Sequence, residues 1–463
     1  MKYYLSIILM SLCGIFAFAQ NGGITEDMMT AIRKGYGDTP EERALRNAIS
    51  ANSISRLAVR QGITSTYDFH FSDEVPSKGI SDQKSSGRCW LFSGLNVLRA
   101  DFIRENNLGA FQFSQNYNFF WDQLEKANLF LQGIIDTRDL PMDDRKVEWL
   151  FRHPIGDGGQ FTGVSDLIMK YGVVPAQVMP ETNSSNSTSG MSNLIGLKLK
   201  EFGLELREMT APKKELAAKL QERKVEMLAF IYRFLVLNLG EPPTEFEWTM
   251  YDASGKPVST KTYTPKSFYQ EYIGKDLKSS YVMLMNDPTR EYYKVYEIEY
   301  DRHVYDGKNW LYINLPIEEI KKMAIASIKD STMMYFSCDV GKFLDSPNGV
   351  LDVNYYDYGS LMGTTFGMDK RERILTGSSG SSHAMTLMAV DLDAQGNPKK
   401  WKVENSWGMS GHKGHLVMTD EWFEEYMFRL VVEKKYVPEN ILRLLDTKPI
   451  MLPPWDPMFA EEL

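Results

Sequence analysis

The sequence contains only three cysteines and six histidines among its 463 residues. So few cysteines exclude a small fold held together by many disulfides. Basic residues are not in excess, because 52 Lys and Arg stand against 61 Asp and Glu, with a net charge of −9. This balance argues against nucleic acid as a partner, since phosphate binding relies on a basic surface. The remaining composition, 43% hydrophobic and 24% charged, is that of a globular protein with a substantial core.

Long hydrophobic runs are absent except at the N-terminus. There Lys2 precedes a largely apolar stretch, residues 3–18, and Ala17-Phe18-Ala19 forms a small-x-small pattern before a polar segment. This order is typical of a secretory signal peptide, and the stretch is slightly shorter than the ~20 apolar residues of a membrane span. We therefore expect cleavage after Ala19, an exported protein (periplasmic or secreted) and no stable membrane anchor.

Cleavage would leave two cysteines, Cys89 and Cys338, in the mature chain. In an exported protein, two cysteines can simply form one structural disulfide. The alternative is that one of them is a catalytic nucleophile, which needs an activating environment. The residues around each cysteine must decide between these interpretations.

Cys89 lies where a polar loop leads into an apolar helix. The apolar residues after it recur at the spacing of one helical face, at Leu91, Leu95, Leu98 and Phe102. The backbone amides and the dipole at a helix N-terminus stabilise a thiolate, which favours a nucleophile over a half-cystine. Gln83, six residues upstream, can place its side-chain amide near the sulfur. With the Cys89 backbone N–H, this amide would form an oxyanion hole.

His383 begins an apolar segment, residues 383–390, that has the character of a strand. A turn at residues 393–398 leads to a second strand that ends near Asn405. If the two strands pair as a hairpin, His383 and Asn405 lie nearly opposite each other, with their Cβ atoms about 5 Å apart. The Asn405 carbonyl oxygen would then accept from imidazole Nδ1–H and leave Nε2 facing the sulfur, in a Cys–His–Asn triad. Trp407 could shield that hydrogen bond from water.

These segments resemble the papain-like cysteine peptidases, and more narrowly the bleomycin hydrolase and aminopeptidase C family. The resemblance extends in order from about residue 60 to the C-terminus. The segments that carry it are residues 83–92, 113–117, 157–160, 170–175, 180–182, 337–342, 383–385, 404–408, 411–414, 418–423 and 452–458.

The resemblance implies an α+β fold with two lobes, a helical lobe that carries the cysteine and an antiparallel β lobe that carries the histidine and asparagine. It implies four catalytic roles: nucleophile for Cys89, base and acid for His383, orienting residue for Asn405 and oxyanion donor for Gln83. It also implies that the C-terminal tail lies along the cleft and that its last carboxylate, here at Leu463, pairs with the free amine of the substrate. The enzyme would therefore be an aminopeptidase.

Two further features concern substrate binding. The segment Asp157-Gly158-Gly159 can form a wall of the cleft, because its glycines let a substrate backbone approach closely. A plain tight turn is the alternative for these residues. Trp407 is expected to contact substrate as well as to cover the triad.

Cys89 and His383 are 294 positions apart, which is far more than a minimal papain-like domain needs and indicates a large insertion. The expected parts are a signal peptide at 1–19, the first part of the catalytic domain at 20–192, an insertion at 193–330, the β lobe at 331–440 and a C-terminal arm at 441–463. The resemblance implies that the insertion assembles a homohexamer around a central channel that contains the active sites.

The sequence thus predicts an exported cysteine aminopeptidase that hydrolyses peptides with a free N-terminus through a thioester acyl-enzyme. No cofactor is expected, and His412 and His415 lack a carboxylate or cysteine at the spacing of metal ligands. Two alternatives stay open. One is an endopeptidase whose C-terminal arm is displaced, and the other is an inactive binding homologue whose two cysteines form a disulfide.

Overall fold

The structure of the protein is a computed structural model that describes residues 22–458. The chain divides into two units, Met1–Ala58 and Val59–Leu463. The first unit contains, within its described part, the helices α1 (Glu26–Lys34), α2 (Pro40–Ala51) and α3 (Ile54–Ala58). Helix α2 begins with a capping box, because the Thr39 side chain accepts from the Glu42 backbone and Glu42 bonds back to Thr39. The expected signal peptide lies outside the described residues.

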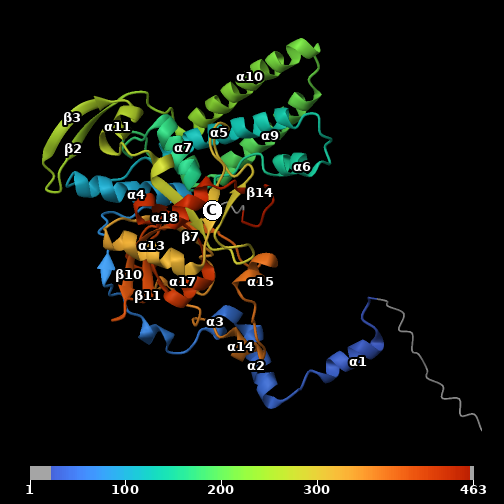
Figure 1. Cartoon of the computed structure of the whole chain (residues 1–463). Helices are drawn as coiled ribbons and strands as arrows, with labels where there is room; N and C mark the ends of the chain where they lie inside the picture. The colour runs from blue at the N-terminus through green and yellow to red at the C-terminus, as the bar shows by residue number, and fades with distance from the viewer. Residues whose placement is uncertain (1–21, 459–463) are drawn as a thin grey trace, which may run out of the picture. The chain divides into compact units, whose positions relative to one another are not determined.

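The helical lobe of the second unit begins at the candidate nucleophile. Its helices are α4 (Cys89–Glu105), α5 (Gln115–Asp136), α6 (Arg145–Arg152), α7 (Phe161–Tyr171), α8 (Asn183–Asn186), α9 (Ser189–Glu208) and α10 (Lys213–Leu239) (Figure 1). Helix α4 starts where the apolar spacing predicts, but it is buried on almost every side, so it is a core helix rather than an amphipathic one. Helix α5 packs beside it, and Ser114 caps α5 by accepting from the Tyr117 N–H at 3.0 Å.

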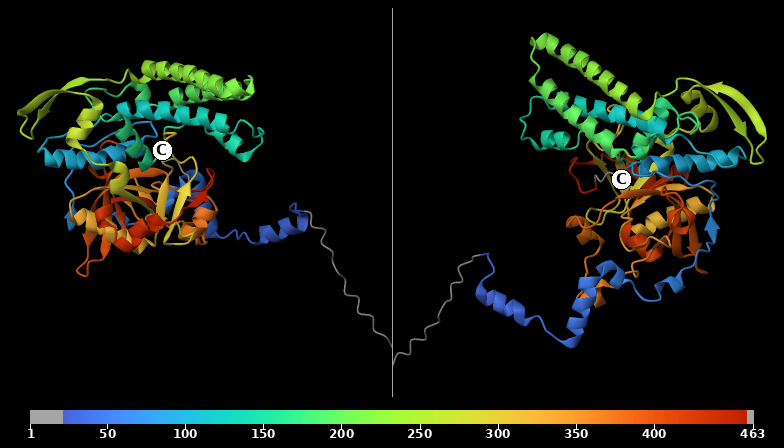
Figure 2. Two further views of the ribbon diagram at one scale, coloured as in Figure 1. Left: turned by 45° about the horizontal axis from the view of Figure 1, so that its top comes forward. Right: turned by 180° about the vertical axis from the view of Figure 1, so that it is seen from behind.

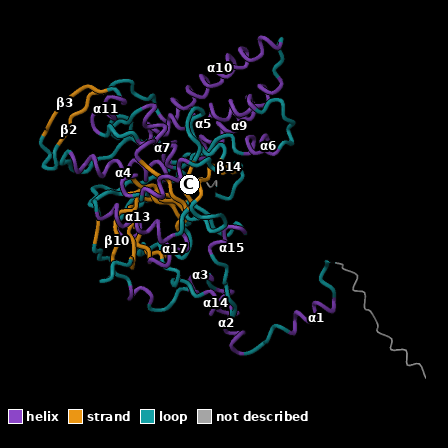
Figure 3. Tube along the Cα trace, viewed as in Figure 1, coloured by secondary structure: helices purple, strands orange, loops and turns teal. Residues whose placement is uncertain are grey.

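A twelve-stranded sheet lies beneath these helices (Figure 3). Its strands are β1 (Asp73–Glu74), β4 (Tyr281–Met285), β5 (Lys294–Ile298), β6 (Leu311–Asn314), β7 (Met334–Cys338), β8 (Leu344–Asp345), β9 (Val350–Leu351), β10 (His383–Leu392), β11 (Pro398–Glu404), β12 (His415–Thr419), β13 (Met427–Glu433) and β14 (Ile450–Leu452). The strand order is β14-β5-β6-β4-β13-β7-β10-β11-β12-β9-β8, and β1 pairs with β10. Most neighbours are antiparallel, which agrees with the expected β lobe of an α+β fold.

The remaining elements cover the sheet or extend from the helical lobe. The helices are α11 (Pro265–Tyr272), α12 (Leu277–Ser280), α13 (Ile317–Lys329), α14 (Tyr358–Met362), α15 (Lys370–Leu375), α16 (Ser410–Lys413), α17 (Asp420–Tyr426) and α18 (Glu439–Leu442). A separate hairpin joins β2 (Phe246–Tyr251) to β3 (Pro257–Tyr263). Figure 2 shows that this hairpin and α10 lie at opposite ends of the helical lobe. Within the described residues, no helix is both long and apolar enough to cross a membrane.

The region expected as an insertion, residues 193–330, contributes directly to the large sheet. Strand β4 pairs along its length with β13, which in turn pairs with β7 of the expected β lobe. The sheet is therefore continuous from the insertion into the lobe that carries His383. The boundaries of the insertion stay a prediction, but its strands and the β lobe share one hydrophobic core.

Candidate active site

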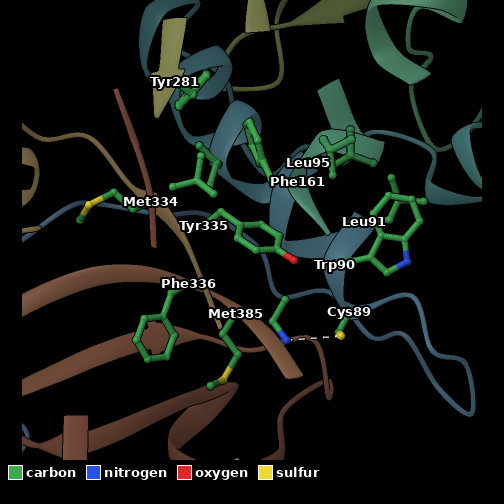
Figure 4. Packing of buried hydrophobic residues seen from close by; sticks show 14 of the residues in the cluster. Cys89, Trp90, Leu91, Leu95, Phe161, Tyr281, Met334, Tyr335, Phe336 and Met385 are labelled. Carbon is green, nitrogen blue, oxygen red and sulfur yellow. Dashed lines mark hydrogen bonds between the residues drawn. The ribbon is translucent and has the colours of Figure 1, made fainter. Parts of the chain in front are cut away.

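Cys89 is the first residue of α4 and is fully buried. The backbone N–H of Ala384, the second residue of β10, lies 3.4 Å from the Cys89 sulfur and points toward it. Figure 4 shows this contact between the helix and the strand, with the indole of Trp90 beside the sulfur-bearing residue. The fold thus brings His383, the neighbour of Ala384, next to Cys89, although the two are far apart in the sequence.

His383 and Asn405 are joined by a hydrogen bond of 2.8 Å from imidazole Nε2 to the amide oxygen Oδ1. The expected assignment of the two ring nitrogens is therefore wrong, because Nε2 rather than Nδ1 contacts Asn405. The same oxygen accepts from the Ser406 backbone N–H at 2.8 Å, which fixes the Asn405 side chain. The ring of Trp407 covers His383, with 4.7 Å between ring centroids, as the sequence predicts.

The hairpin register differs by two residues from the simple pairing of His383 with Asn405. Thr386 pairs with Glu404, so Asn405 follows the last paired residue of β11. Two irregularities in the hairpin shift the register by one residue in opposite senses and cancel each other. An offset of two residues keeps both side chains on one face of a sheet, whereas an offset of one would separate them. This is why the histidine and the asparagine still meet.

The loop before the nucleophile is fixed to the Asn405 segment by Gln83. The Gln83 backbone N–H donates to the Ser406 carbonyl at 2.8 Å, and the Ser406 hydroxyl donates to Gln83 Oε1 at 2.6 Å. Gln83 Nε2 donates to the Ser86 carbonyl at 2.6 Å. A primary amide has two N–H donors, so the second can serve a substrate oxygen. Ser406, which the sequence did not single out, holds both Gln83 and Asn405.

Asp157 supports the nucleophile loop from the other side. Its carboxylate accepts from the Gly87 backbone N–H at 2.7 Å and from the Thr188 hydroxyl. Its backbone carbonyl accepts from Trp90 Nε1 at 2.9 Å. These contacts give Asp157 a structural role, because it holds the loop at Gly87, two residues before Cys89. Contact of Asp157 with substrate stays a prediction.

The glycine at position 159 is required by packing within the protein. A Cβ atom there would lie 2.2 Å from the His303 ring and 2.9 Å from the Trp90 ring. Both Gly158 and Gly159 are buried, and the Gly158 carbonyl accepts from Lys126 Nζ at 2.5 Å. The close approach that the sequence predicts at this glycine is thus made by an imidazole of the protein itself. Contact of Gly158 and Gly159 with substrate stays a prediction.

A buried polar cluster behind Trp90 was not predicted. His303 Nδ1 lies 2.5 Å from Asp122 Oδ1, and Lys126 Nζ lies 3.1 Å from the other oxygen of the same carboxylate. Burial raises the pKa of Asp122, but the charges of Lys126 and His303 outweigh it, and the pKa is lowered overall. The spacing of Asp122 and Lys126 by four residues on one helix was the available signal. Their partner His303 lies in a distant loop.

Three other expected features have different outcomes. Cys89 and Cys338 are not joined in a disulfide, which disagrees with the disulfide alternative. The described residues contain no group of three or more His, Cys, Asp or Glu that could hold a metal, and the His412 ring stacks on Phe69 at 3.8 Å. Leu463 lies outside the described residues. The C-terminal arm can be followed to Met458, whose carbonyl accepts from Arg429 at 2.7 Å.

The chain matches known proteins over almost its whole length. The model of the Peptidase C1-like family matches residues 23–459. The chain is 38% identical to "Bleomycin hydrolase" of Homo sapiens over 455 residues, which covers 95% of this chain and 99% of that protein. It is 38% identical to "Aminopeptidase C" of Lactobacillus delbrueckii subsp. lactis over 443 residues, which covers 94% of this chain and 98% of that protein.

A solved structure gives the same result for the fold. The crystal structure of PepW from Lactobacillus rhamnosis HN001 is 38% identical, with a TM-score of 0.90, and the match covers 95% of this chain and 99% of that one. Both the helical lobe and the sheet are therefore shared along nearly the whole length. The chain belongs to the Peptidase C1-like family and has the papain-like fold of cysteine peptidases.

Proposed function

We propose that this protein is a cysteine aminopeptidase that uses Cys89, His383 and Asn405 to remove N-terminal residues from peptides. One observation carries the proposal. The buried Cys89 sulfur at the N-terminus of α4 contacts the backbone beside His383, while His383 is bonded to Asn405. Relatives named bleomycin hydrolase and aminopeptidase C, matched over almost their whole length, support peptides as the substrate class.

The proposed reaction begins with proton transfer from the Cys89 thiol to His383. Asn405 accepts from Nε2–H, so the proton is taken by Nδ1 and a thiolate–imidazolium pair forms. The amides at the start of α4 stabilise the thiolate. The sulfur attacks the carbonyl carbon of the N-terminal residue, and the carbonyl oxygen becomes an oxyanion. The Cys89 backbone N–H and Gln83 Nε2–H donate to that oxyanion.

Collapse of this intermediate breaks the peptide bond. His383 gives its Nδ1 proton to the leaving amine nitrogen, and a thioester remains on Cys89. Water, deprotonated by His383, then attacks the thioester carbonyl. The N-terminal residue leaves as a carboxylic acid, and the Cys89–His383 pair is restored. Each bond that forms or breaks is thus accounted for by these two side chains and one water molecule.

Exopeptidase specificity is proposed to come from the C-terminal arm. The last carboxylate, at Leu463, would pair with the substrate's free amine, and Asp157, Gly158, Gly159 and Trp407 would contact the substrate. The attachment of the arm supports this proposal, because Met458 is buried and is held by Arg429, and Asp456 forms an ion pair with Arg290. The attached residues Asp456 and Met458 would then hold the start of the short segment that carries the Leu463 carboxylate to the substrate amine.

Mass spectrometry of the products from one peptide, unblocked and N-acetylated, tests this function. We expect stepwise loss of N-terminal residues from the unblocked peptide and no cleavage of the acetylated one. Cys89→Ala should abolish product while the melting temperature is retained, and Cys338→Ala is the matched control that keeps activity. Unchanged turnover by Cys89→Ala would exclude the mechanism. Internal cleavage of the acetylated peptide would identify an endopeptidase.

We further propose that the protein is exported and forms a homohexamer. Export is supported by the apolar N-terminal stretch, and the mature chain should begin at Gln20 when its N-terminal peptide is sequenced. Self-association is supported by exposed apolar side chains on α9 and α10. They are Leu194, Leu197, Leu204, Val225, Phe230 and Leu237. A purified full-length chain with uncleaved residues 1–19 would contradict export.

A further inference from the structure

A buried arginine immediately precedes the candidate nucleophile. The Arg88 side chain is fully buried, and its guanidinium lies between the rings of Phe92 and Phe119, at 5.2 and 5.3 Å from their centroids. Arginine stays charged in a protein, so burial in this apolar setting requires a counter-charge. Glu181 supplies it, because Arg88 Nη2 lies 2.9 Å from Oε2 and Nη1 donates to Oε1 at 3.1 Å.

The same guanidinium is connected to the oxyanion donor through one serine. Arg88 Nε donates to the Ser86 hydroxyl at 3.0 Å, and that hydroxyl donates to the Gln83 backbone carbonyl at 2.6 Å. Because the hydroxyl accepts from Arg88, its single hydrogen is directed toward Gln83. The Ser86 carbonyl in turn accepts from Gln83 Nε2 at 2.6 Å. Ser86 therefore holds both the backbone and the side chain of Gln83.

The acidic partner is attached to helices α5 and α8, and α8 also contacts the loop, because the Asn186 carbonyl accepts from the Ser85 N–H at 3.0 Å. Asn116 of α5 donates to the Pro180 carbonyl at 2.8 Å, directly before Glu181. Thr182, directly after it, caps α8 by accepting from Ser185 N–H at 3.1 Å. Glu181 is thus held on both sides by helices, and its carboxylate provides a fixed point to which Arg88 is bound.

We infer that the Arg88–Glu181 ion pair is a positioning device for the Gln83 amide. This inference rests on the proposed function, in which Gln83 stabilises the oxyanion. The pair fixes Ser86, and Ser86 uses one N–H of Gln83 and thereby orients the other toward the substrate carbonyl. Arg88 and Glu181 are positioning residues, since their side chains are connected to Gln83 through Ser86.

The test replaces both charges at once, in a double variant Arg88→Met/Glu181→Met. Apolar replacement of both members of the pair leaves no unpaired charge, so folding is preserved. We expect kcat on an unblocked peptide amide to fall by about 10- to 100-fold with little change in KM, as for a misplaced oxyanion donor. The rate of Cys89 alkylation by iodoacetamide should stay unchanged, because alkylation needs the thiolate and no oxyanion donor.

A double-mutant cycle with Gln83→Ala separates positioning of the Gln83 amide from a general disturbance of the active site. In the Gln83→Ala background, the double variant should lower kcat no further, because the group that the ion pair positions is already absent. Lys321→Met is the control for loss of a buried cation. Lys321 is paired with Asp420 at 2.6 Å and Glu424 at 2.5 Å outside this network, so its loss should leave kcat unchanged.

Several results would overturn the inference while leaving the proposed function intact. One is an unchanged kcat in the double variant. Another is a further fall of kcat by the same factor in the Gln83→Ala background. The third is a fall in the rate of Cys89 alkylation that parallels the fall in kcat. If the double variant does not fold, Glu181→Gln, which removes one charge and keeps one oxygen for Arg88, is measured in the same cycle. Failure of the wild-type protein to release N-terminal residues would instead contradict the proposed function.

Discussion

Arg99 of α4 and Glu404 of β11 form an ion pair in which both side chains are almost completely buried. Arg99 lies ten positions after Cys89 on the same helix, and Glu404 directly precedes Asn405. Ser77 donates to the second Glu404 oxygen at 2.5 Å and accepts from Arg99 at 3.2 Å. The pair therefore joins the helix of the nucleophile to the strand that leads into the orienting asparagine.

Glu404→Gln should destabilise the protein strongly. The change leaves the Arg99 charge buried without its counter-charge, which costs about 3–5 kcal/mol of unfolding free energy. Urea denaturation followed by tryptophan fluorescence measures the loss. Glu271→Gln is the control, because Glu271 pairs with Lys261 at an exposed position and should contribute no more than about 1 kcal/mol. Equal effects of the two changes would contradict this account of the buried pair.

Asn405→Ala should lower kcat by about 10- to 100-fold with a smaller effect on KM, because His383 loses the acceptor that orients its ring. Steady-state kinetics on an unblocked peptide amide measure the change. Asn397→Ala is the matched control, since Asn397 lies in the exposed turn of the same hairpin and bonds only Asp393 there. A comparable loss in both variants would point to disruption of the hairpin instead of the triad.

Lys370 should make stability depend on pH. Burial lowers the pKa of Lys370 to about 7, although its amine bonds to Asn286 Oδ1 and two backbone carbonyls. The pKa of an unfolded lysine is ~10.4. Between these values the unfolded chain binds a proton that the folded chain does not, so the free energy of unfolding rises with pH.

Chemical denaturation at pH 7, 8 and 9 tests this expectation with Lys370→Met as the reference. The stability of the wild-type protein relative to Lys370→Met should increase with pH, by at most about 1.4 kcal/mol per pH unit. Below pH 7 the difference should level off, because the lysine is then protonated in both states. Parallel pH curves for the two proteins would show that Lys370 keeps its proton when folded.

Leu197→Glu/Leu237→Glu should reduce self-association if α9 and α10 form the contact. These side chains are 66% and 69% exposed, so the change does not disturb the core of one subunit. Light scattering coupled to size-exclusion chromatography measures the mass, and we expect a hexamer for the wild-type protein and smaller species for the variant. Val258→Glu on the β2–β3 hairpin is the control at another exposed apolar position. A wild-type monomer would contradict the hexamer.

Local signals explain what the sequence could predict. The start of α4 at Cys89 follows from a polar loop that precedes an apolar helical repeat, and the Ser114 cap follows from the residue type. The meeting of His383 with Asn405 could be inferred from hairpin geometry. The register and the bonded ring nitrogen could not. The hairpin is already offset by two residues at its turn, where Leu392 pairs with Pro398, and the bonded nitrogen depends on how the His383 ring is turned.

Contacts between distant segments explain what was missed. Glu181 reaches Arg88 across 93 positions, and Ser406 reaches Gln83 across 323. Nothing in the residue types selects these partners, since serines and glutamates are numerous and most lie at surfaces. An arginine directly before an apolar helix was the one usable signal. It indicates that a counter-charge must be near, but not which carboxylate supplies it.

The continuity of the sheet across residues 193–330 has a consequence for how the protein is made. Helix α4 packs on β10, and β4 pairs with β13, so segments that are synthesised earlier need partners from the last hundred residues. During synthesis, the side of α4 that packs on β10 and the edge of β4 stay uncovered until those strands emerge. Such non-local topology folds slowly and is prone to aggregate while incomplete. The nascent chain should therefore depend on chaperones until its final strands are in place.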